Sequence, residues 1–199
     1  KQQISMQYDL LNMENMKTKY ESLKNQINPH FLFNSLGTLK SLIKTNPDKA
    51  QQYVQQFSFV FRYTIQNKDL VSLREELEFM KAYGELMRIR YGDNLRIDTD
   101  IDPKYDDYPV IPLSIQTLVE NAIKHNVISR KFPLHITIAV NRDGSLVISN
   151  PIRLKQEPES GEGIGLANLS QRYVLRLNQD ITINNRDNKF EIILPLIKL

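Results

Sequence analysis

Three short stretches of the sequence carry residue types that could bind or transfer a charged group. The first, "ENAIKH", holds Glu120, Asn121, Lys124 and His125. In a helix, Asn121 and His125 share one face, with Glu120 and Lys124 on the adjoining strip. Oxygen atoms of Asn and Glu suit Mg²⁺, which usually bridges to phosphates, and a Lys or His nearby could meet those phosphates. Taken alone, a solvated helix edge with one Glu–Lys pair is the more ordinary interpretation.

The second stretch is a glycine loop in front of an apolar helical pattern. Gly161, Gly163 and Gly165 precede "LANLSQRYVLRL", so backbone amides and the helix N-terminus could face an anion. No Gly-Lys-Ser/Thr follows, which excludes a Walker loop. A long polar loop separates the glycines from the preceding strand, unlike the dinucleotide fingerprint. A simple turn remains an alternative.

The third stretch, "NQINPHFLFNSL", places a proline and a histidine inside a long helical pattern. Pro29 disfavours helical geometry at the residue before it and can turn the face of the helix. A new apolar stripe follows, made of Leu32, Leu36, Leu39 and Ile43, and His30 falls to its side. We therefore interpret the break as a device that presents the imidazole of His30.

Two further residues have a plain structural interpretation. Asn150 ends a predicted strand beside Pro151, where Asn is usually a turn residue, although its amide could also meet a base edge. His135 begins a strand among hydrophobic residues and is interpreted as structural.

Residues 1 to about 92 are predicted to be entirely helical. Met6, Met13, Tyr20 and Ile27 recur every seven residues, which favours a parallel dimeric coiled coil over a single amphipathic helix. Asn46 is the predicted N-cap of a second helix beginning at Pro47. Its apolar stripe consists of Tyr53, Phe57, Val60, Phe61 and Ile65. Two facing stripes predict an antiparallel hairpin, and two such hairpins a four-helix bundle.

A capping box from Ser72 to Glu75 starts a further helix that reaches about Tyr91. From residue 93 the pattern becomes mixed: a strand in "LRIDTDI", a helix in "PLSIQTLVENAIKHNVI", and hairpins in "LHITIAV"–"SLVIS" and "DITIN"–"KFEIILPL". This predicts an α+β chain, with helices over residues 1–92 and a two-layer α/β sandwich with an antiparallel or mixed sheet over residues 93–199.

The composition is that of an ordinary globular protein. The 199 residues are 41% hydrophobic and 25% charged, and the net charge of +3 comes from interleaved bases and acids, which argues against nucleic acid. The absence of cysteine excludes disulfides, thiolate metal sites and a cysteine nucleophile. No apolar run approaches the roughly 20 residues of a membrane helix. The sequence begins at Lys1 in mid-pattern, so we expect a fragment, with any membrane segment outside it.

Four motifs together resemble one family. "NQINPHFLFNSL", "SLREELEFMKAY", "LVENAIKHN" and "GEGIGLANL", in this order and spacing, are similar to those of the LytS-type sensor histidine kinases. The resemblance covers nearly the whole chain. It implies a dimeric helical hairpin bundle that carries the phosphoacceptor, over residues 1–92, and an ATP-binding domain of the Bergerat (GHKL) type, over residues 93–199.

The resemblance also implies roles for single residues. His30 would be the phosphoacceptor. Apart from the resemblance, Asn34, one turn along, is a candidate to orient its ring, and an acid from the other domain or subunit is the alternative. Asn121 would be the Mg²⁺ ligand, flanked by Glu120, and Lys124 and His125 would lie near the phosphates of ATP. The remaining nucleotide contacts would be Asn150, Gly161, Gly163, Gly165 and Leu166.

Two positions depart from the family pattern. Asn150 stands where an Asp usually accepts from the adenine amino group, and a neutral acceptor implies modest nucleotide affinity. Phe31 follows the histidine where many histidine kinases have an acidic residue.

The function that the resemblance implies is autophosphorylation on His30 and phosphotransfer to an aspartate of a response regulator. The implied partner is the receiver domain of that regulator, and the resemblance suggests a LytTR-type output for it. A phosphatase acting on that regulator and a non-catalytic dimeric scaffold are the alternatives. The implied location is the cytoplasmic portion of a membrane sensor protein.

Overall fold

The computed structural model describes residues 29–66, 68–155 and 164–198. The predicted coiled coil of residues 1–28 lies outside them. The chain divides into two compact units, Lys1–Gln66 and Asn67–Leu199. None of the described helices combines the length and hydropathy that crossing a membrane requires.

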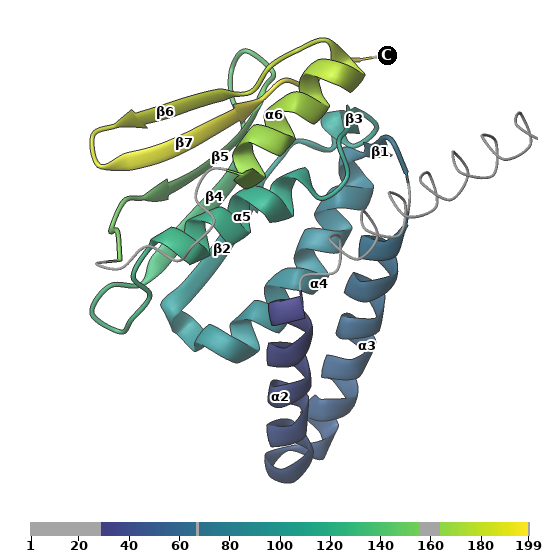
Figure 1. The fold of residues 1–199 in the computed structure, drawn as a ribbon, viewed down its shortest axis with the longest axis vertical. Helices are drawn as coiled ribbons and strands as arrows, with labels where there is room; N and C mark the ends of the chain where they lie inside the picture. The colour runs from purple at the N-terminus through teal and green to yellow at the C-terminus, as the bar shows by residue number, and fades with distance from the viewer. Residues whose placement is uncertain (1–28, 67, 156–163, 199) are drawn as a thin grey trace, which may run out of the picture. The chain divides into compact units, whose positions relative to one another are not determined.

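The first unit contains the predicted helical hairpin. Its helices are α2 (Pro29–Thr45) and α3 (Pro47–Ile65), and they pack against each other (Figure 1). The Asn46 side chain accepts a hydrogen bond from the Lys49 backbone N–H at 3.1 Å, so the predicted N-cap is confirmed. The rings of Phe31 and Phe57 stack across the hairpin, with their centroids 6.1 Å apart.

The apolar stripe of α2 packs only in part against α3. Leu32 and Leu39 are half-buried, whereas Leu36 and Ile43 are 48% and 58% exposed. Phe33 is 71% exposed as well. Two helices alone bury one narrow strip each, so a wide apolar stripe leaves residues outside that strip. The hairpin therefore carries an uncovered apolar face.

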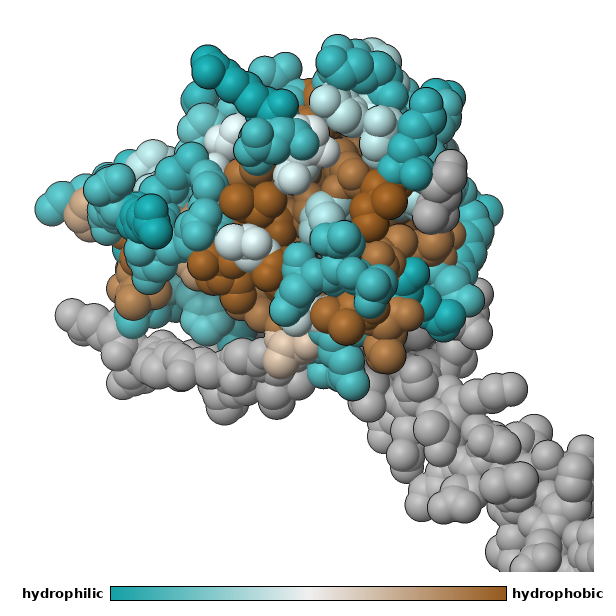
Figure 2. Space-filling model, turned by 90° about the horizontal axis from the view of Figure 1, so that it is seen from above, coloured by the Kyte–Doolittle hydropathy of each residue, from teal (hydrophilic) through white to brown (hydrophobic). Residues whose placement is uncertain are grey.

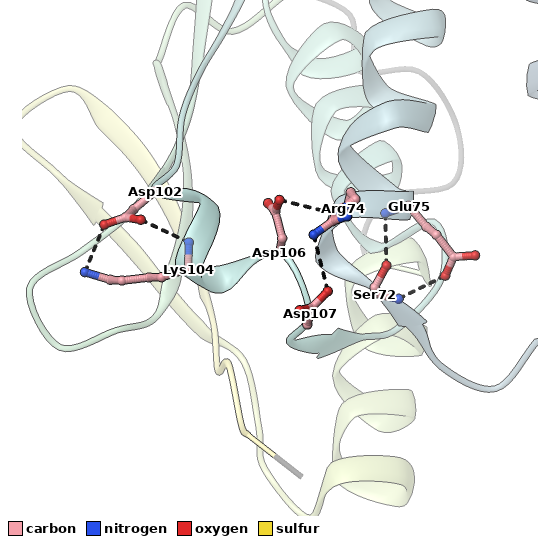
Figure 3. Close-up of polar contacts among 7 residues, drawn as sticks. All are labelled: Ser72, Arg74, Glu75, Asp102, Lys104, Asp106 and Asp107. Carbon is pink, nitrogen blue, oxygen red and sulfur yellow. Dashed lines mark hydrogen bonds and ion pairs between the residues drawn. The ribbon is translucent and has the colours of Figure 1, made fainter.

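The second unit begins with a short strand and a capped helix. Strand β1 (Val71–Ser72) pairs antiparallel with β3 (Pro109–Val110), a pairing that no sequence signal predicted. Helix α4 (Leu73–Tyr91) follows, and the predicted capping box is confirmed. The Ser72 hydroxyl accepts from the Glu75 N–H, and the Glu75 carboxylate accepts from the Ser72 N–H, at 3.2 and 3.1 Å (Figure 3).

Helix α4 belongs to the second unit. Its fully or nearly fully buried side chains include Leu73, Phe79, Tyr83 and Leu86. The predicted boundary at residue 92 falls at the end of α4, whereas the two compact units divide after Gln66. A helical pattern shows that a segment is helical but not which core it packs against, and this explains the difference.

The main sheet of the second unit is mixed. Its strands are β2 (Leu95–Asp100), β4 (Leu134–Val140), β5 (Leu146–Pro151), β6 (Thr182–Arg186) and β7 (Lys189–Leu194), in the spatial order β2-β4-β5-β7-β6. Strands β2 and β4 are parallel, and every other neighbouring pair is antiparallel. Both predicted hairpins are thus confirmed.

Helices α5 (Ser114–His125) and α6 (Ile164–Leu177) cover one face of this sheet (Figure 1). Strand β4 shows the expected alternation, since Leu134, Ile136 and Ile138 are buried whereas His135 is exposed. His135 bonds through its Nε2 to the carboxylate of Asp98 on β2. This agrees with the structural interpretation of His135.

A polar connection joins β2 to α5. It contains the short 3-10 helix η2 (Pro103–Tyr105). A second short 3-10 helix, η1 (Gly92–Asn94), follows the end of α4. Asp102 accepts from the Lys104 backbone N–H and pairs with its ammonium, and Arg74 pairs with Asp106 and Asp107 (Figure 3). These contacts tie the connection to the start of α4.

Apolar side chains also reach the surface. Figure 2 shows a patch of them rimmed by hydrophilic residues. In the second unit the most exposed large apolar side chains of the described residues are Leu154, Leu175 and Ile183, at 68%, 72% and 49%.

Candidate functional site: a helix that joins α4 to α6

Helix α5, which carries the "ENAIKH" motif, begins beneath a buried carboxylate. Leu113 adopts a left-handed conformation (φ 62°) just before the helix. Glu76 of α4 is 0% exposed and accepts from the backbone N–H groups of Leu113 and Ile115, at 3.0 and 3.1 Å. A negative charge at a helix N-terminus satisfies free N–H groups and complements the helix dipole. Glu76 thus fixes where α5 starts.

Helix α6 contacts the same turn. The Arg172 guanidinium donates to the Pro112 carbonyl at 3.1 Å. Burial lowers the pKa of Arg172, while the negative charge of Glu76 acts in the opposite direction. Helices α4 and α6 therefore both hold the residues that precede α5.

One strip of α5 faces α4. The Glu120 Oε1 atom accepts from the Tyr83 hydroxyl at 3.2 Å and from the Gln116 side-chain amide at 2.9 Å. Burial raises the pKa of the Glu120 carboxyl, and the two hydrogen bonds oppose that rise. Burial, followed by the charge of Glu120, raises the pKa of the Tyr83 phenol well above its usual value.

The adjoining strip of α5 faces the start of α6. A Cβ atom built on Gly165 would lie 3.7 Å from the Thr117 methyl group. Asn121 follows Thr117 by four residues and His125 follows Asn121 by four, so the three share a strip. Asn121, Lys124 and His125 are all half-exposed. The predicted cluster is therefore accessible, and it lies on α5, whose Thr117 faces Gly165 at the start of α6.

The end of α5 is joined to the segment that follows β5. Asn126 is 3% exposed; its amide donates to the Ala122 carbonyl at 2.8 Å, and its Oδ1 accepts from the Arg153 N–H at 2.7 Å. The Lys155 N–H donates to the His125 carbonyl at 3.0 Å. This role of Asn126 was not predicted from the sequence, although an Asn directly after a helical pattern is a signal of a helix end.

Asn150 is the penultimate residue of β5 and is 4% exposed. Its amide donates to the Pro151 carbonyl at 2.8 Å, and the residue lies opposite Phe190 of β7. The Asn150 side chain is therefore buried, and its amide nitrogen is engaged by the backbone of the next residue.

The other predicted site residues lie in three places. Gly165 and Leu166 are in the first turn of α6, whereas Gly161 and Gly163 lie outside the described residues. His30 is the second residue of α2 in the first unit. Asn34 follows one turn later, and its backbone carbonyl accepts from the Thr38 hydroxyl at 3.0 Å.

The donor atoms suit a magnesium nucleotide. Within the described residues no three His, Cys, Asp or Glu side chains gather into a metal-binding cluster. Mg²⁺ commonly takes one or two protein oxygens and completes its shell with water and phosphate. The half-exposed amide of Asn121, on the same strip of α5 as Thr117, fits that requirement.

The known proteins to which this chain is similar are histidine kinases. Residues 18–95 match the histidine kinase family. The chain is 34% identical over 170 residues to the sensor histidine kinase/phosphatase LytS of Staphylococcus aureus, in strains Mu50 and N315 alike. The match covers 76% of this chain and 29% of the relative, so the chain spans less than a third of the length of these curated relatives.

Two solved histidine kinase structures can be superposed in part on this chain. The mycobacterial sensor histidine kinase MprB is 15% identical, with a TM-score of 0.43, over 65% of this chain and 98% of that one. The catalytic domain of histidine kinase ThkA is 18% identical, with a TM-score of 0.44, over 64% and 94%. The family match and the LytS similarity confirm the resemblance predicted from the motifs: this chain is a relative of the LytS-type sensor histidine kinases.

Proposed function

We propose that this chain is the kinase core of a two-component sensor histidine kinase, which phosphorylates itself on His30 with ATP and passes the phosphoryl group to a response regulator. The observation that carries the proposal is the strip of Asn121 and His125 along α5, beside the first turn of the helix that the glycines precede. The similarity to LytS supports it. Asn150, Lys124, Gly161, Gly163, Gly165 and Leu166 would complete the nucleotide contacts.

The roles of the residues follow from their chemistry. Asn121 would hold Mg²⁺ through its amide oxygen, with Glu120 beside it. Mg²⁺, when bound, neutralises charge on the phosphates of ATP. Lys124 and His125 would contact those phosphates, and the N–H groups at the start of α6 would favour their negative charge.

The transfer step needs a neutral imidazole at His30. An unperturbed histidine has a pKa of ~6.5 and is mostly neutral at pH 7. One ring nitrogen attacks the γ-phosphorus, a P–N bond forms, the bond to the β,γ-bridging oxygen breaks, and ADP leaves. The surplus ring proton passes to solvent. Asn34, one turn along α2, would orient the ring, and catalysis would rest on positioning.

The test is incubation of the chain with γ-labelled ATP and Mg²⁺, followed by acid and alkali treatment of the labelled protein. His30→Gln is the test variant, and His135→Gln, at the exposed histidine paired with Asp98, is the matched control. Label that survives alkali, is lost in acid, persists in His135→Gln and is absent from His30→Gln supports the proposal. Label that persists in His30→Gln contradicts it.

A phosphatase of the response regulator is the second candidate, because the relatives are named kinase/phosphatase. Adding a receiver domain already phosphorylated on aspartate separates the two activities. Faster loss of its phosphate with the chain present, together with no labelling of His30, would favour the phosphatase.

The partners and location follow from the same proposal. The chain would act as a homodimer and bind the receiver domain of a response regulator, for which the similarity to LytS suggests a LytTR-type output. It would lie on the cytoplasmic side of a membrane, to which a segment outside this sequence would attach it.

A further inference from the structure

Glu120 and Asn121 are neighbours in the sequence but face different elements. Gln116 and Glu120 form the strip of α5 that meets Tyr83 of α4. Thr117 lies one strip over, against the start of α6, and Asn121 shares its strip. The predicted nucleotide side of α5 is thus the side of Asn121, whereas the Glu120 carboxyl is directed to α4.

The Glu120 carboxyl is already engaged. Its Oε1 atom accepts two hydrogen bonds, from a phenol and from an amide. Tyr83 is 2% exposed and its ring stacks on Phe79, with centroids 6.2 Å apart, so the donor hydroxyl is held firmly in place. Turning this carboxyl to a metal ion would break its hydrogen bonds with a buried phenol and with the Gln116 amide, which is unfavourable.

Helix α4 holds α5 at two points on one of its own faces. Glu76 caps the start of α5, and Tyr83 meets Glu120 in its middle. Residues seven apart in a helix are about two turns apart on the same face. The two contacts together fix both the position and the rotation of α5 relative to α4.

We propose that Glu120 is a positioning residue: its bond with Tyr83 sets the rotation of α5, which holds Asn121 and His125 toward the start of α6, and Glu120 does not itself bind Mg²⁺. This inference rests on the proposed nucleotide site. It replaces the flanking metal-ligand role of Glu120 and makes Tyr83 part of the machinery of that site.

Nucleotide binding to the chain, measured by calorimetry with Mg²⁺ and again in EDTA, tests the proposal. Tyr83→Phe keeps the ring and removes the donor, and Glu120→Ala removes the acceptor. Tyr83→Phe is expected to weaken ATP binding about fivefold, which is the effect of losing one hydrogen bond. Glu120→Ala should weaken it somewhat more, because it also removes the acceptor of the Gln116 amide. Each loss should have the same factor with and without Mg²⁺. The double variant should bind no more weakly than Glu120→Ala.

Two further variants serve as controls. Glu120→Gln keeps an oxygen that can accept from Tyr83 and Gln116, so it should recover most of the affinity that Glu120→Ala loses. Tyr105→Phe removes a hydroxyl from η2, outside α4 and α5, and tests for a general effect of losing a phenol.

Three results would overturn the proposal. A loss in Glu120→Ala that occurs only with Mg²⁺, with Tyr83→Phe binding as the parent does, would make Glu120 a metal ligand. Additive losses in the double variant would show that Tyr83 does not act through Glu120. A loss in Glu120→Gln as large as in Glu120→Ala would show that the charge matters rather than the acceptor.

Hydrogen exchange of the nucleotide-free chain separates this inference from the proposed function. Tyr83→Phe and Glu120→Ala should speed exchange of the amides in the middle of α5, and Glu120→Gln should restore it toward the parent rate. If the parent chain binds no ATP, the proposed function fails, and this measurement alone decides the positioning role. Unchanged exchange in both variants would overturn it.

Discussion

At the scale of single residues, the buried polar groups of the second unit hold its helices together. Glu76 is wholly buried on α4, yet its carboxylate caps α5. Asn126 closes the other end of α5 and binds the chain after β5. Both residues act on the backbone of a segment distant in sequence.

Replacing Glu76 by Ala should lower the free energy of unfolding by about 3 kcal/mol, because two N–H groups lose a charged acceptor in a buried place. Urea unfolding of the full chain measures this. Glu78→Ala, at an exposed position of the same helix, is the matched control and should change stability by less than about 0.5 kcal/mol. Equal losses in the two variants would contradict the capping role.

Replacing Asn126 by Ala should destabilise the chain by about 2 kcal/mol, since the Arg153 N–H would lose its buried acceptor. Hydrogen exchange should then rise at residues 153–155 more than in β4. Uniformly faster exchange throughout the second unit would instead indicate a global effect.

The sequence identified the accessible residues of the site better than the buried ones. Asn121, Lys124 and His125 are half-exposed along α5, as a helical pattern predicts. Glu76 and Asn126 were missed because their partners lie 37 or more and 27 positions away, respectively. No local pattern encodes such partners. Glu76 in particular sits in "SLREE", where only Ser72 and Glu75 carry a local signal.

At the scale of elements, local sequence signals correctly predicted helix caps and hairpins, whose interacting residues are near one another in the sequence. The caps at Asn46 and Ser72 and both hairpins of the sheet are confirmed. Strands β1 and β3, each of two residues, were missed, because they exist only through their mutual pairing. The position of the boundary between the units depends on what α4 packs against, which is likewise a long-range property.

The stability that Glu75 contributes at the start of α4 should depend on pH. The Lys68 ammonium, followed by the Ser72 N–H, lowers the pKa of Glu75 below 4.5 in the folded chain. A carboxyl whose pKa is lower in the folded state than in the unfolded state stabilises the folded state at pH values above its unfolded-state pKa. That stabilisation is lost as the pH falls through its folded-state pKa. The stability difference between the parent and Glu75→Gln should therefore shrink from pH 7 to pH 3 in urea unfolding. A constant difference would contradict this. Glu78→Gln controls for the change in net charge.

At the scale of the whole molecule, the division into two units predicts which fragments of the chain should fold by themselves. A chain of residues 68–199 should fold and unfold cooperatively, because α4 supplies Leu73, Phe79 and Leu86 to its core. A chain of residues 93–199 lacks these side chains and should not. Circular dichroism during thermal unfolding tests both. A cooperative transition in the shorter fragment would show that α4 is dispensable to that core.

The apolar face of the first unit should mediate dimer formation. Phe33, Leu36 and Ile43 are 71%, 48% and 58% exposed on α2, and several large apolar side chains exposed on one helix usually meet a partner. The double variant Phe33→Glu/Ile43→Glu should halve the mass measured by light scattering. Ser41→Glu, at an exposed position of α2 to the side of the face that carries Phe33 and Ile43, is the control. An unchanged dimer in the double variant would place the interface elsewhere.

The parallel pairing of β2 with β4 has a consequence for synthesis of the chain. Among the described strands β4 is the only neighbour of β2, and the whole of α5 lies between them in sequence. A ribosome therefore releases β2 well before the strand that will pair with it. Until β4 emerges, the newly made chain carries an unpaired strand edge, which is the kind of surface on which nascent proteins aggregate and chaperones act.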